Sequence, residues 1–123
     1  MTHVAITGWG KCMPPAVLTN ADLASIMETD DEWITSRTGI KERRVSHVTG
    51  IELAHVAVVR ALACAGLDAK DIDLIVYGSC SNDEAVPNSA SGVQVRLGAM
   101  HAAACRGENL DAARRCAEVR GDV

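Results

Sequence analysis

Trp33 and Arg37 are the residue pair in this sequence with the clearest potential for chemistry. They lie four positions apart in a segment typical of a helix, so their side chains project from one face. A Trp ring can stack on a nucleobase, and an Arg guanidinium can hold a phosphate through paired hydrogen bonds. The same spacing is also typical of a surface pair in which the guanidinium lies over the indole ring. Spacing alone favours this packing interpretation.

A basic segment surrounds the second member of that pair. Arg37, Lys41, Arg43 and Arg44 fall within it, and only Glu42 opposes their charge. Phosphate groups need positive charge nearby, so the segment supports a phosphate-binding hypothesis. Most charge runs, however, are simply solvated faces, and composition alone favours that interpretation.

The cysteines could form disulfides, hold a metal ion or act as nucleophiles. Their number is odd, and no two are separated by only two residues, so neither a disulfide framework nor a zinc site is predicted. We expect reduced thiols in a cytoplasmic protein, with Cys64 and Cys80 as small core residues. His47 and His55 also lack metal-ligand spacing, so no metal is predicted. The five cysteines are Cys12, Cys64, Cys80, Cys105 and Cys116.

Composition sets the class of protein that is expected. The 123 residues are 48% hydrophobic and 23% charged, which is typical of one modest globular domain. The net charge of −4 argues against a general nucleic-acid binder, which would normally be basic. No segment is apolar enough to span a bilayer, and residues 1–10 lack the pattern of a secretory signal.

The elements that must position these side chains alternate between strand and helix. A strand is predicted at residues 4–7, running into a turn at Gly8-Trp9-Gly10. A dinucleotide-binding fingerprint is rejected there because its third glycine would fall at Met13 and because Pro14-Pro15 forbids an immediate helix. A second strand, predicted to be covered on both faces, is the apolar run at residues 74–77. This order predicts an α/β fold with a parallel sheet and crossover helices.

Four helices are predicted from their end signals. Asn20 is expected to cap the first, with Leu23, Ile26 and Met27 on one face. Acidic residues from Asp30 onward are expected to start the second, which ends before Gly39. The remaining two are predicted from a capping box at Thr49 and Glu52 to Gly66, with an apolar face of Leu53, Val56, Ala57, Leu62 and Cys64, and from Pro87 to Gly98.

Several segments, in order, resemble β-ketoacyl-acyl carrier protein synthase III over about residues 3–104. The Asp-Glu-Trp-Ile-x-x-Arg-Thr-Gly-Ile segment is highly specific, and the others support it. The matching segments are Leu18-Thr19-Asn20-Ala21-Asp22-Leu23, Asp31-Glu32-Trp33-Ile34-Thr35-Ser36-Arg37-Thr38-Gly39-Ile40, Glu42-Arg43-Arg44, Ala65-Gly66-Leu67-Asp68, Asp71-Ile72-Asp73-Leu74-Ile75 and Val93-Gln94-Val95-Arg96-Leu97-Gly98-Ala99.

This resemblance implies the first part of a thiolase-like fold, two similar α/β halves that usually form a homodimer. It also implies a reaction that initiates fatty-acid synthesis: a cysteine takes an acyl group from acyl-CoA, and decarboxylation of malonyl-acyl carrier protein then supplies the attacking carbanion. No redox cofactor or metal is implied. Residue by residue, the resemblance places the coenzyme A adenine at Trp33 and Thr29, and the phosphates near Arg37 and Thr38, which reverses the preference drawn from spacing.

The resemblance ends after residue 104. Residues 1–104 therefore form the condensing-enzyme portion, and residues 105–123 form a divergent tail or an out-of-frame extension. The family's nucleophilic cysteine sits at a helix amino terminus. Neither Cys105, which stands where strand residues are expected, nor Cys116, which aligns only with an insertion, is a good equivalent. The family's catalytic His and Asn have no counterpart, so no catalytic residue is assigned and a truncated, inactive chain is expected.

Two alternatives to a truncated enzyme remain open. The chain could be a non-catalytic module that binds coenzyme A or pairs with a full-length relative. It could equally be a remnant without function, whose open helix faces and sheet edges would favour aggregation. The acyl-chain preference is not readable from these residues.

Overall fold

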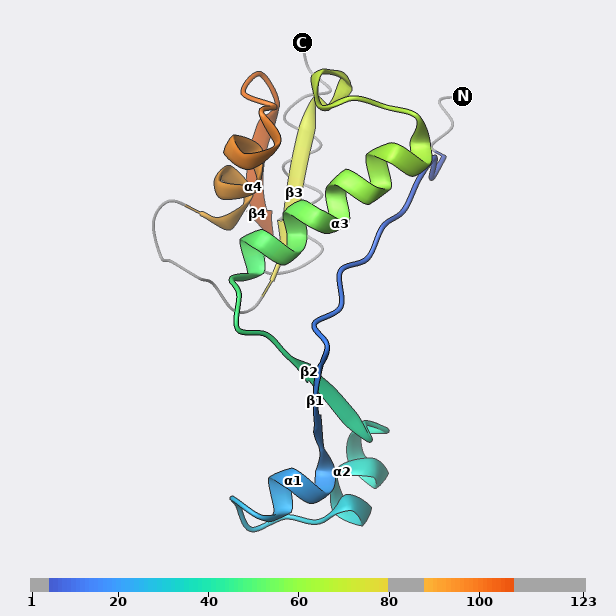
Figure 1. Ribbon diagram of the computed structural model, residues 1–123, viewed down its shortest axis with the longest axis vertical. Coiled ribbons are helices and arrows are strands. Elements are labelled where there is room, and N and C mark those ends of the chain that lie inside the picture. Colours follow the sequence, from blue (N-terminus) through green and yellow to red (C-terminus); the bar gives the residue numbers. More distant parts are fainter. Residues whose placement is uncertain (1–4, 80–87, 108–123) are drawn as a thin grey trace. The chain divides into compact units, whose positions relative to one another are not determined.

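A computed structural model describes residues 5–79 and 88–107 of the chain. The elements divide into two compact units, labelled along the ribbon in Figure 1. The small unit is Met13–His47, and the large unit is Met1–Cys12 together with Val48–Val123. Each is described by itself below.

The small unit is built on a two-stranded antiparallel ribbon. Strand β1 (Ala16–Thr19) pairs with β2 (Glu42–Val45), in a register that runs from Ala16 opposite Val45 to Thr19 opposite Glu42. Helices α1 (Asn20–Ala24) and α2 (Asp31–Thr38) lie between the strands in the sequence. The sequence alone does not predict this ribbon; residues 42–44 stand out there as part of the basic segment and as one of the segments that carry the family resemblance.

Helix α1 begins one residue earlier than expected. Thr19, not Asn20, is its N-cap: the Thr19 hydroxyl accepts from the Asp22 amide at 3.1 Å, and the Asp22 carboxylate accepts from the Thr19 amide at 2.8 Å. The helix ends at Ala24, so Ile26 and Met27 lie beyond it, and Ile26 is 72% exposed. The predicted apolar face with Leu23 is therefore wrong, because the helix is too short to carry it.

Helix α2 has the ends that its sequence predicts. Asp30 is the N-cap, and its carboxylate accepts from the Trp33 amide at 2.7 Å. Gly39 ends the helix with a φ of 71°, a left-handed conformation in which a side chain would be strained. Ile34 is the apolar residue that α2 buries.

The large unit contains one pair of parallel strands, and the predicted strand at residues 74–77 is one member of it. It comprises α3 (Gly50–Ala65), a single 3₁₀ turn η1 (Ala69–Asp71), β3 (Leu74–Gly78), α4 (Ser89–Leu97) and β4 (Ala103–Gly107). Strand β3 pairs with β4 in parallel, from Leu74 opposite Ala103 to Gly78 opposite Gly107. Helix α4 connects the two strands, which confirms the predicted α/β crossover. Strand β4 crosses the predicted boundary at residue 104.

Helix α4 is the best-buried element of the large unit. Asn88 is its N-cap, one residue after the predicted start at Pro87, which lies outside the described residues. Val93 is 1% exposed, a burial worth about 1.5–3 kcal/mol. The Gln94 side-chain amide donates to the Ala102 carbonyl at 2.7 Å, which holds the start of β4 against the helix.

Helix α3 has the predicted ends but not the predicted face. Thr49 and Glu52 form the capping box, and Gly66 ends the helix with a φ of 68°. Val56 and Cys64, however, are exposed, so Cys64 is not a core residue. The helix is contacted on more than one side, so the spacing of its bulky residues does not identify a single buried face. Strand β3 is likewise less covered than expected, because Val76 is 42% exposed.

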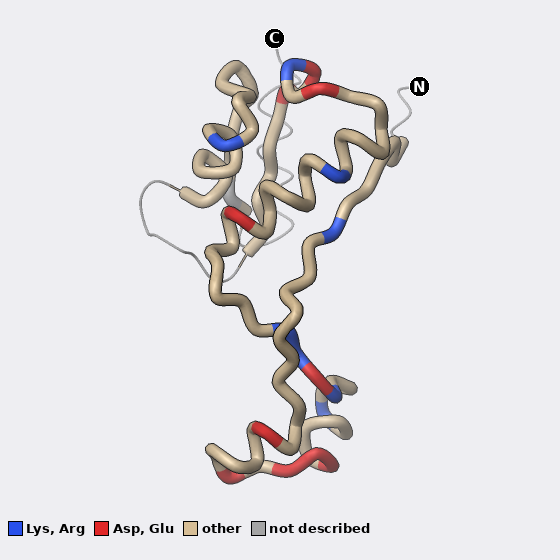
Figure 2. Tube along the Cα trace, in the orientation of Figure 1, with Lys and Arg blue, Asp and Glu red and all other residues tan. Residues whose placement is uncertain are grey.

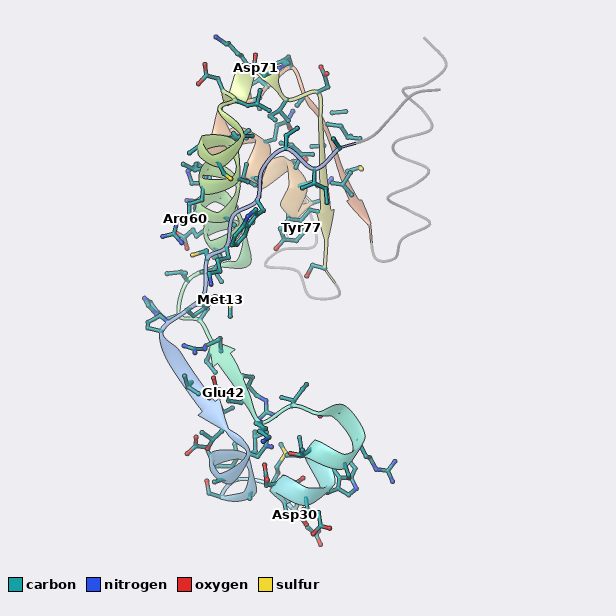
Figure 3. The ribbon with its side chains drawn as sticks, turned by 90° about the vertical axis from the view of Figure 1, so that its right-hand side faces the viewer. Met13, Asp30, Glu42, Arg60, Asp71 and Tyr77 are labelled. Carbon is teal, nitrogen blue, oxygen red and sulfur yellow. The ribbon has the colours of Figure 1, made fainter. Side chains whose placement is uncertain are left out.

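The segment before the small unit makes no strand, in contrast to the prediction. Residues 5–10 have no ladder partner among the described strands, and residue 4 lies outside them. Gly8 and Gly10 instead lie against α3: a Cβ on Gly10 would collide with the Ala57 carbonyl oxygen. The Arg60 guanidinium of α3 (labelled in Figure 3) donates to the Lys11 carbonyl at 2.6 Å. These glycines thus permit close backbone approach rather than a turn.

We expect Gly10→Ala to lower the free energy of unfolding by about 1–3 kcal/mol, the usual effect of overpacking, because α3 backbone atoms occupy the space that its Cβ needs. Denaturant unfolding checks this. Gly78→Ala is the matched control, since its Cβ would meet nothing closer than the Gly107 oxygen at 4.0 Å. Equal stability of the two variants would contradict the close contact.

The capping box of α1 predicts a pH effect. Hydrogen bonds from the Thr19 hydroxyl, and then from its backbone amide, hold the pKa of Asp22 below its ordinary value of 3.8. A lowered pKa in the folded state contributes stability above pH 3.8 that is lost as the pH falls through the folded-state pKa. We expect NMR titration to show this lowered midpoint, and Thr19→Ala to return it toward 3.8; an unchanged midpoint would contradict the capping box.

Candidate functional site

The Trp33 and Arg37 side chains meet on the surface of α2. The Arg37 guanidinium carbon lies 5.3 Å from the centre of the Trp33 ring, within the range of a cation–π contact. The packing pair that spacing favours is therefore present. Trp33 is nevertheless 55% exposed, so its ring also retains surface on which a planar base can stack.

A hollow beside Trp33 contains the other residue predicted for the adenine. The hollow is open, has a volume of about 280 Å³, and is lined by Glu28, Thr29, Asp30 and Trp33. The Thr29 hydroxyl oxygen is inaccessible to solvent and has no hydrogen-bond partner. A buried hydroxyl without a partner is unfavourable, so Thr29 has unused hydrogen-bonding capacity, which a ligand in this hollow would reach once the side chain rotates toward it.

Carboxylates surround the exposed part of the indole. A second open hollow, of about 300 Å³, is lined by Asp30, Glu32, Trp33 and Ser36. We call Glu28, Asp30 and Glu32 the acidic rim; Figure 2 shows the acidic positions gathered along the stretch that leads into α2. Negative charge here disfavours a phosphate beside the ring, so a bound nucleotide would place its base, and not its phosphates, at the rim. From the sequence, Asp30 and Glu32 are interpreted as favouring a helix start, and Glu28 is assigned no role.

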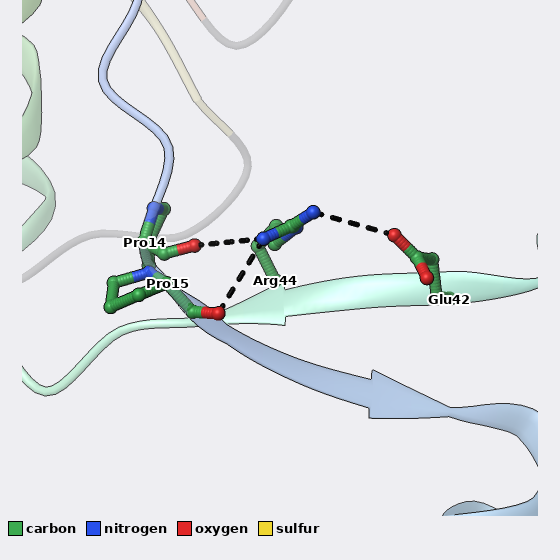
Figure 4. Close-up of polar contacts among 4 residues, drawn as sticks. All are labelled: Pro14, Pro15, Glu42 and Arg44. Carbon is green, nitrogen blue, oxygen red and sulfur yellow. Dashed lines mark hydrogen bonds and ion pairs between the residues drawn. The ribbon is translucent and has the colours of Figure 1, made fainter.

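Two of the four basic side chains in the basic segment form hydrogen bonds within the small unit, and the other two are exposed. The Arg44 guanidinium donates to the Pro14 and Pro15 carbonyls and pairs with Glu42, each at 3.5 Å (Figure 4). Arg43 donates to the Asn20 side chain at 2.9 Å. Arg37 and Lys41, by contrast, are exposed. Half of the predicted phosphate-binding charge therefore stabilises the small unit itself.

Thr38, predicted to lie near the phosphates, is engaged by its own backbone. Its hydroxyl donates to the Ile34 carbonyl at 2.7 Å and accepts from the Ile40 amide at 3.1 Å. It would have to rotate to donate to a phosphate. The structure thus places Thr29 in a hollow beside Trp33 and Arg37 over the Trp33 ring, whereas the Thr38 hydroxyl participates in the end of α2.

Asn20 is the residue of this region that sequence reasoning missed. It is 2% exposed, and its amide nitrogen donates to the Asp31 carboxylate at 2.6 Å and the Ile40 carbonyl at 2.8 Å. Its side-chain oxygen accepts from Arg43. We had interpreted Asn20 as a helix cap. The spacing of Thr19 and Asp22 is an alternative capping signal, and it would have left Asn20 free for another role.

Cys105 does not occupy the kind of position that the resemblance implies for the family's nucleophile. Cys105 lies within β4, opposite Val76 of β3, and not at a helix amino terminus. Cys80 and Cys116 lie outside the described residues. Within residues 5–79 and 88–107, no group of three or more His, Cys, Asp or Glu side chains could hold a metal ion.

Comparison with known proteins shows what this chain is similar to. No protein-family model matches the chain. Among curated proteins, β-ketoacyl-[acyl-carrier-protein] synthase III 2 of Vibrio cholerae is 55% identical over 102 residues, which are 83% of this chain and 28% of that protein. The synthase III of Roseiflexus castenholzii is 49% identical over 81% of this chain and 31% of its own length. The chain is a homologue of the β-ketoacyl-[acyl-carrier-protein] synthases III.

Solved structures of synthase III proteins share this fold. The crystal structure of 3-oxoacyl-[acyl-carrier-protein] synthase III from Aquifex aeolicus has a TM-score of 0.80 at 36% identity, covering 94% of this chain and 38% of that one. The priming β-ketosynthase of the R1128 polyketide pathway has a TM-score of 0.74 at 30% identity, covering 83% of this chain and 31% of that one. The chain thus has a partial thiolase-like fold and spans about 30% of the length of its curated relatives. None of its described helices is long and apolar enough to cross a bilayer.

The helix that carries the Trp33–Arg37 pair depends on its N-cap. We expect Asp30→Ala to destabilise the small unit by about 1 kcal/mol, because the Trp33 amide loses its acceptor. Asp30→Asn keeps a side-chain oxygen and should retain most of this stability. Amide hydrogen exchange of α2 measures both; equal exchange rates in the two variants would contradict the capping role.

Proposed function

We propose that this chain is the part of a synthase III-type condensing acyltransferase that binds the nucleotide end of coenzyme A at α2. The single observation that carries the proposal is the exposed Trp33 ring with the Arg37 guanidinium 5.3 Å from its centre. The 55% identity to a synthase III supports it. Coenzyme A is part of the substrate in this proposal, and no separate cofactor is required.

Each of the predicted residues has a proposed role. The adenine stacks on Trp33 and takes a hydrogen bond with the Thr29 hydroxyl, which has no partner in the protein. The phosphates lie toward Arg37, with the exposed Lys41 adding positive charge, because the acidic rim would repel them elsewhere. Thr38 contributes only if its hydroxyl leaves the Ile34 carbonyl.

The reaction proposed for the whole enzyme is a decarboxylative condensation. A cysteine thiolate attacks the acyl-CoA carbonyl, so that the acyl group moves to the cysteine and coenzyme A leaves as the thiol. Malonyl-acyl carrier protein then loses carbon dioxide, and its carbanion attacks the new thioester and releases the cysteine. The partners in this proposal are acyl-CoA and acyl carrier protein, in a cytoplasmic homodimer.

We further propose that these 123 residues do not perform the condensation alone. The support is that Cys105, in the middle of β4, has neither the helix dipole nor the position that activates a thiolate. A second candidate is a partial domain without binding activity. It is favoured by the exposure of large apolar side chains such as Ile6, Val95 and Met100, and it predicts aggregation at increasing protein concentration.

Fluorescence titration tests the coenzyme A proposal. In a Trp9→Phe background Trp33 is the sole tryptophan, and we expect its emission to be quenched by coenzyme A but not by pantetheine, which lacks the nucleotide. Arg37→Ala should weaken binding at least tenfold, because a charged hydrogen bond contributes about 1.5–3 kcal/mol. Arg60→Ala is the control: it removes the same charge from α3 and should leave the affinity unchanged.

The possible outcomes separate the candidates. Two results would contradict a nucleotide site on α2. One is quenching of Trp33 fluorescence by pantetheine, and the other is an equal loss of coenzyme A affinity in the Arg37→Ala and Arg60→Ala variants. No quenching together with concentration-dependent aggregation would favour the partial domain without binding activity. Incubation with an acyl-CoA and malonyl-acyl carrier protein should give no condensation product, and turnover would overturn the proposed inactivity.

A further inference from the structure

We propose that Asn20 is a positioning residue for the nucleotide site: it holds both ends of α2 and thereby determines where Trp33 and Arg37 lie. This inference rests on the proposed function of α2. Asn20 touches neither side chain of the pair among its hydrogen-bond partners, so its effect is exerted through the helix that carries them.

The first observation is that Asn20 contacts the two ends of one helix. Its amide nitrogen donates to Asp31, the first residue of α2, at 2.6 Å. The same nitrogen donates to the carbonyl of Ile40, which follows the Gly39 cap, at 2.8 Å. Both amide hydrogens are used, and they constrain the helix at its start and at its finish.

The second observation is that Asn20 also contacts the ribbon. Its side-chain oxygen accepts from the Arg43 guanidinium of β2 at 2.9 Å, and its backbone amide donates to the Lys41 carbonyl at 3.3 Å. Asn20 therefore fixes α2 against the segment that contains Lys41.

The third observation is that no other common side chain of this size satisfies the same neighbours. Two acceptors, the Asp31 carboxylate and the Ile40 carbonyl, face one end of the amide, and a donor faces the other. An aspartate at position 20 would set a carboxylate against the Asp31 carboxylate, and a leucine would remove the hydrogen bonds that Asn20 makes to all three neighbours. Ile34 is the only other buried residue of the small unit, so apolar packing offers little compensation.

The experiment uses the whole chain in the Trp9→Phe background. We expect Asn20→Asp to weaken coenzyme A binding at least tenfold and to speed amide exchange in α2. The double variant Asn20→Asp, Asp31→Asn exchanges the carboxylate and the amide at conserved net charge. It should recover part of the lost affinity, because position 31 again meets a complementary group while the Ile40 carbonyl still lacks its donor. Rescue of this kind is not expected if Asn20 contributes only general stability.

Thr19→Ala is the matched structural control. It removes the cap of α1 next to Asn20 without touching α2, so it should lower the melting temperature and leave the coenzyme A affinity unchanged. Unchanged affinity in Asn20→Asp, or an equal loss in Thr19→Ala, would overturn the positioning role. Absence of binding by the parent protein would overturn the proposed function instead. The amide hydrogen exchange measurement needs no ligand. An unchanged exchange rate of the α2 amides in Asn20→Asp would by itself overturn the positioning role.

Discussion

The small unit depends on one buried amide more than on an apolar core. Asn20 and Ile34 are its only buried residues, and a segment of this length buries too little apolar surface to be held by packing alone. Hydrogen bonds differ from apolar contacts in being directional: the Asn20 amide accepts from one side and donates to the other. The position of α2 is therefore set by the geometry of a few polar bonds. The same bonds determine where the exposed Trp33 and Arg37 side chains lie.

Helix ends were the part of the fold that the sequence predicted best. Asp30, Gly39 and the pair of Thr49 and Glu52 were each placed correctly, because a cap is a local arrangement of a few neighbouring residues. The strand that begins at Leu74 was also predicted, from its continuous apolar run, but its parallel partner is β4 and not the segment predicted at residues 4–7. The β1–β2 ribbon was missed because its strands show no alternation of apolar and polar residues, and their pairing joins segments far apart in the chain.

Errors arose where one residue type serves two physical purposes. Gly8 and Gly10 were interpreted as a turn, but they permit contact with a helix almost fifty residues later, which no local pattern reveals. Asn20 was interpreted as a cap because its hydrogen-bond partners also lie too far along the chain for a local pattern to reveal them. In the candidate site, the pair on α2 was predicted correctly as a shared face, whereas the allocation of Arg43 and Arg44 to structural bonds required the folded ribbon. The sequence thus indicated which side chains share a face, but not which of them are used in hydrogen bonds within the fold.

The acidic rim has a consequence for how solution conditions act on a ligand. A nucleotide whose phosphates approach Arg37 gains attraction, but the same phosphates feel repulsion from Glu28, Asp30 and Glu32 and from the net charge of −4. Dissolved ions shorten the range of both effects to about 8 Å at physiological ionic strength. Attraction and repulsion thus weaken together as salt is added, so that base stacking, which ions screen little, comes to dominate recognition.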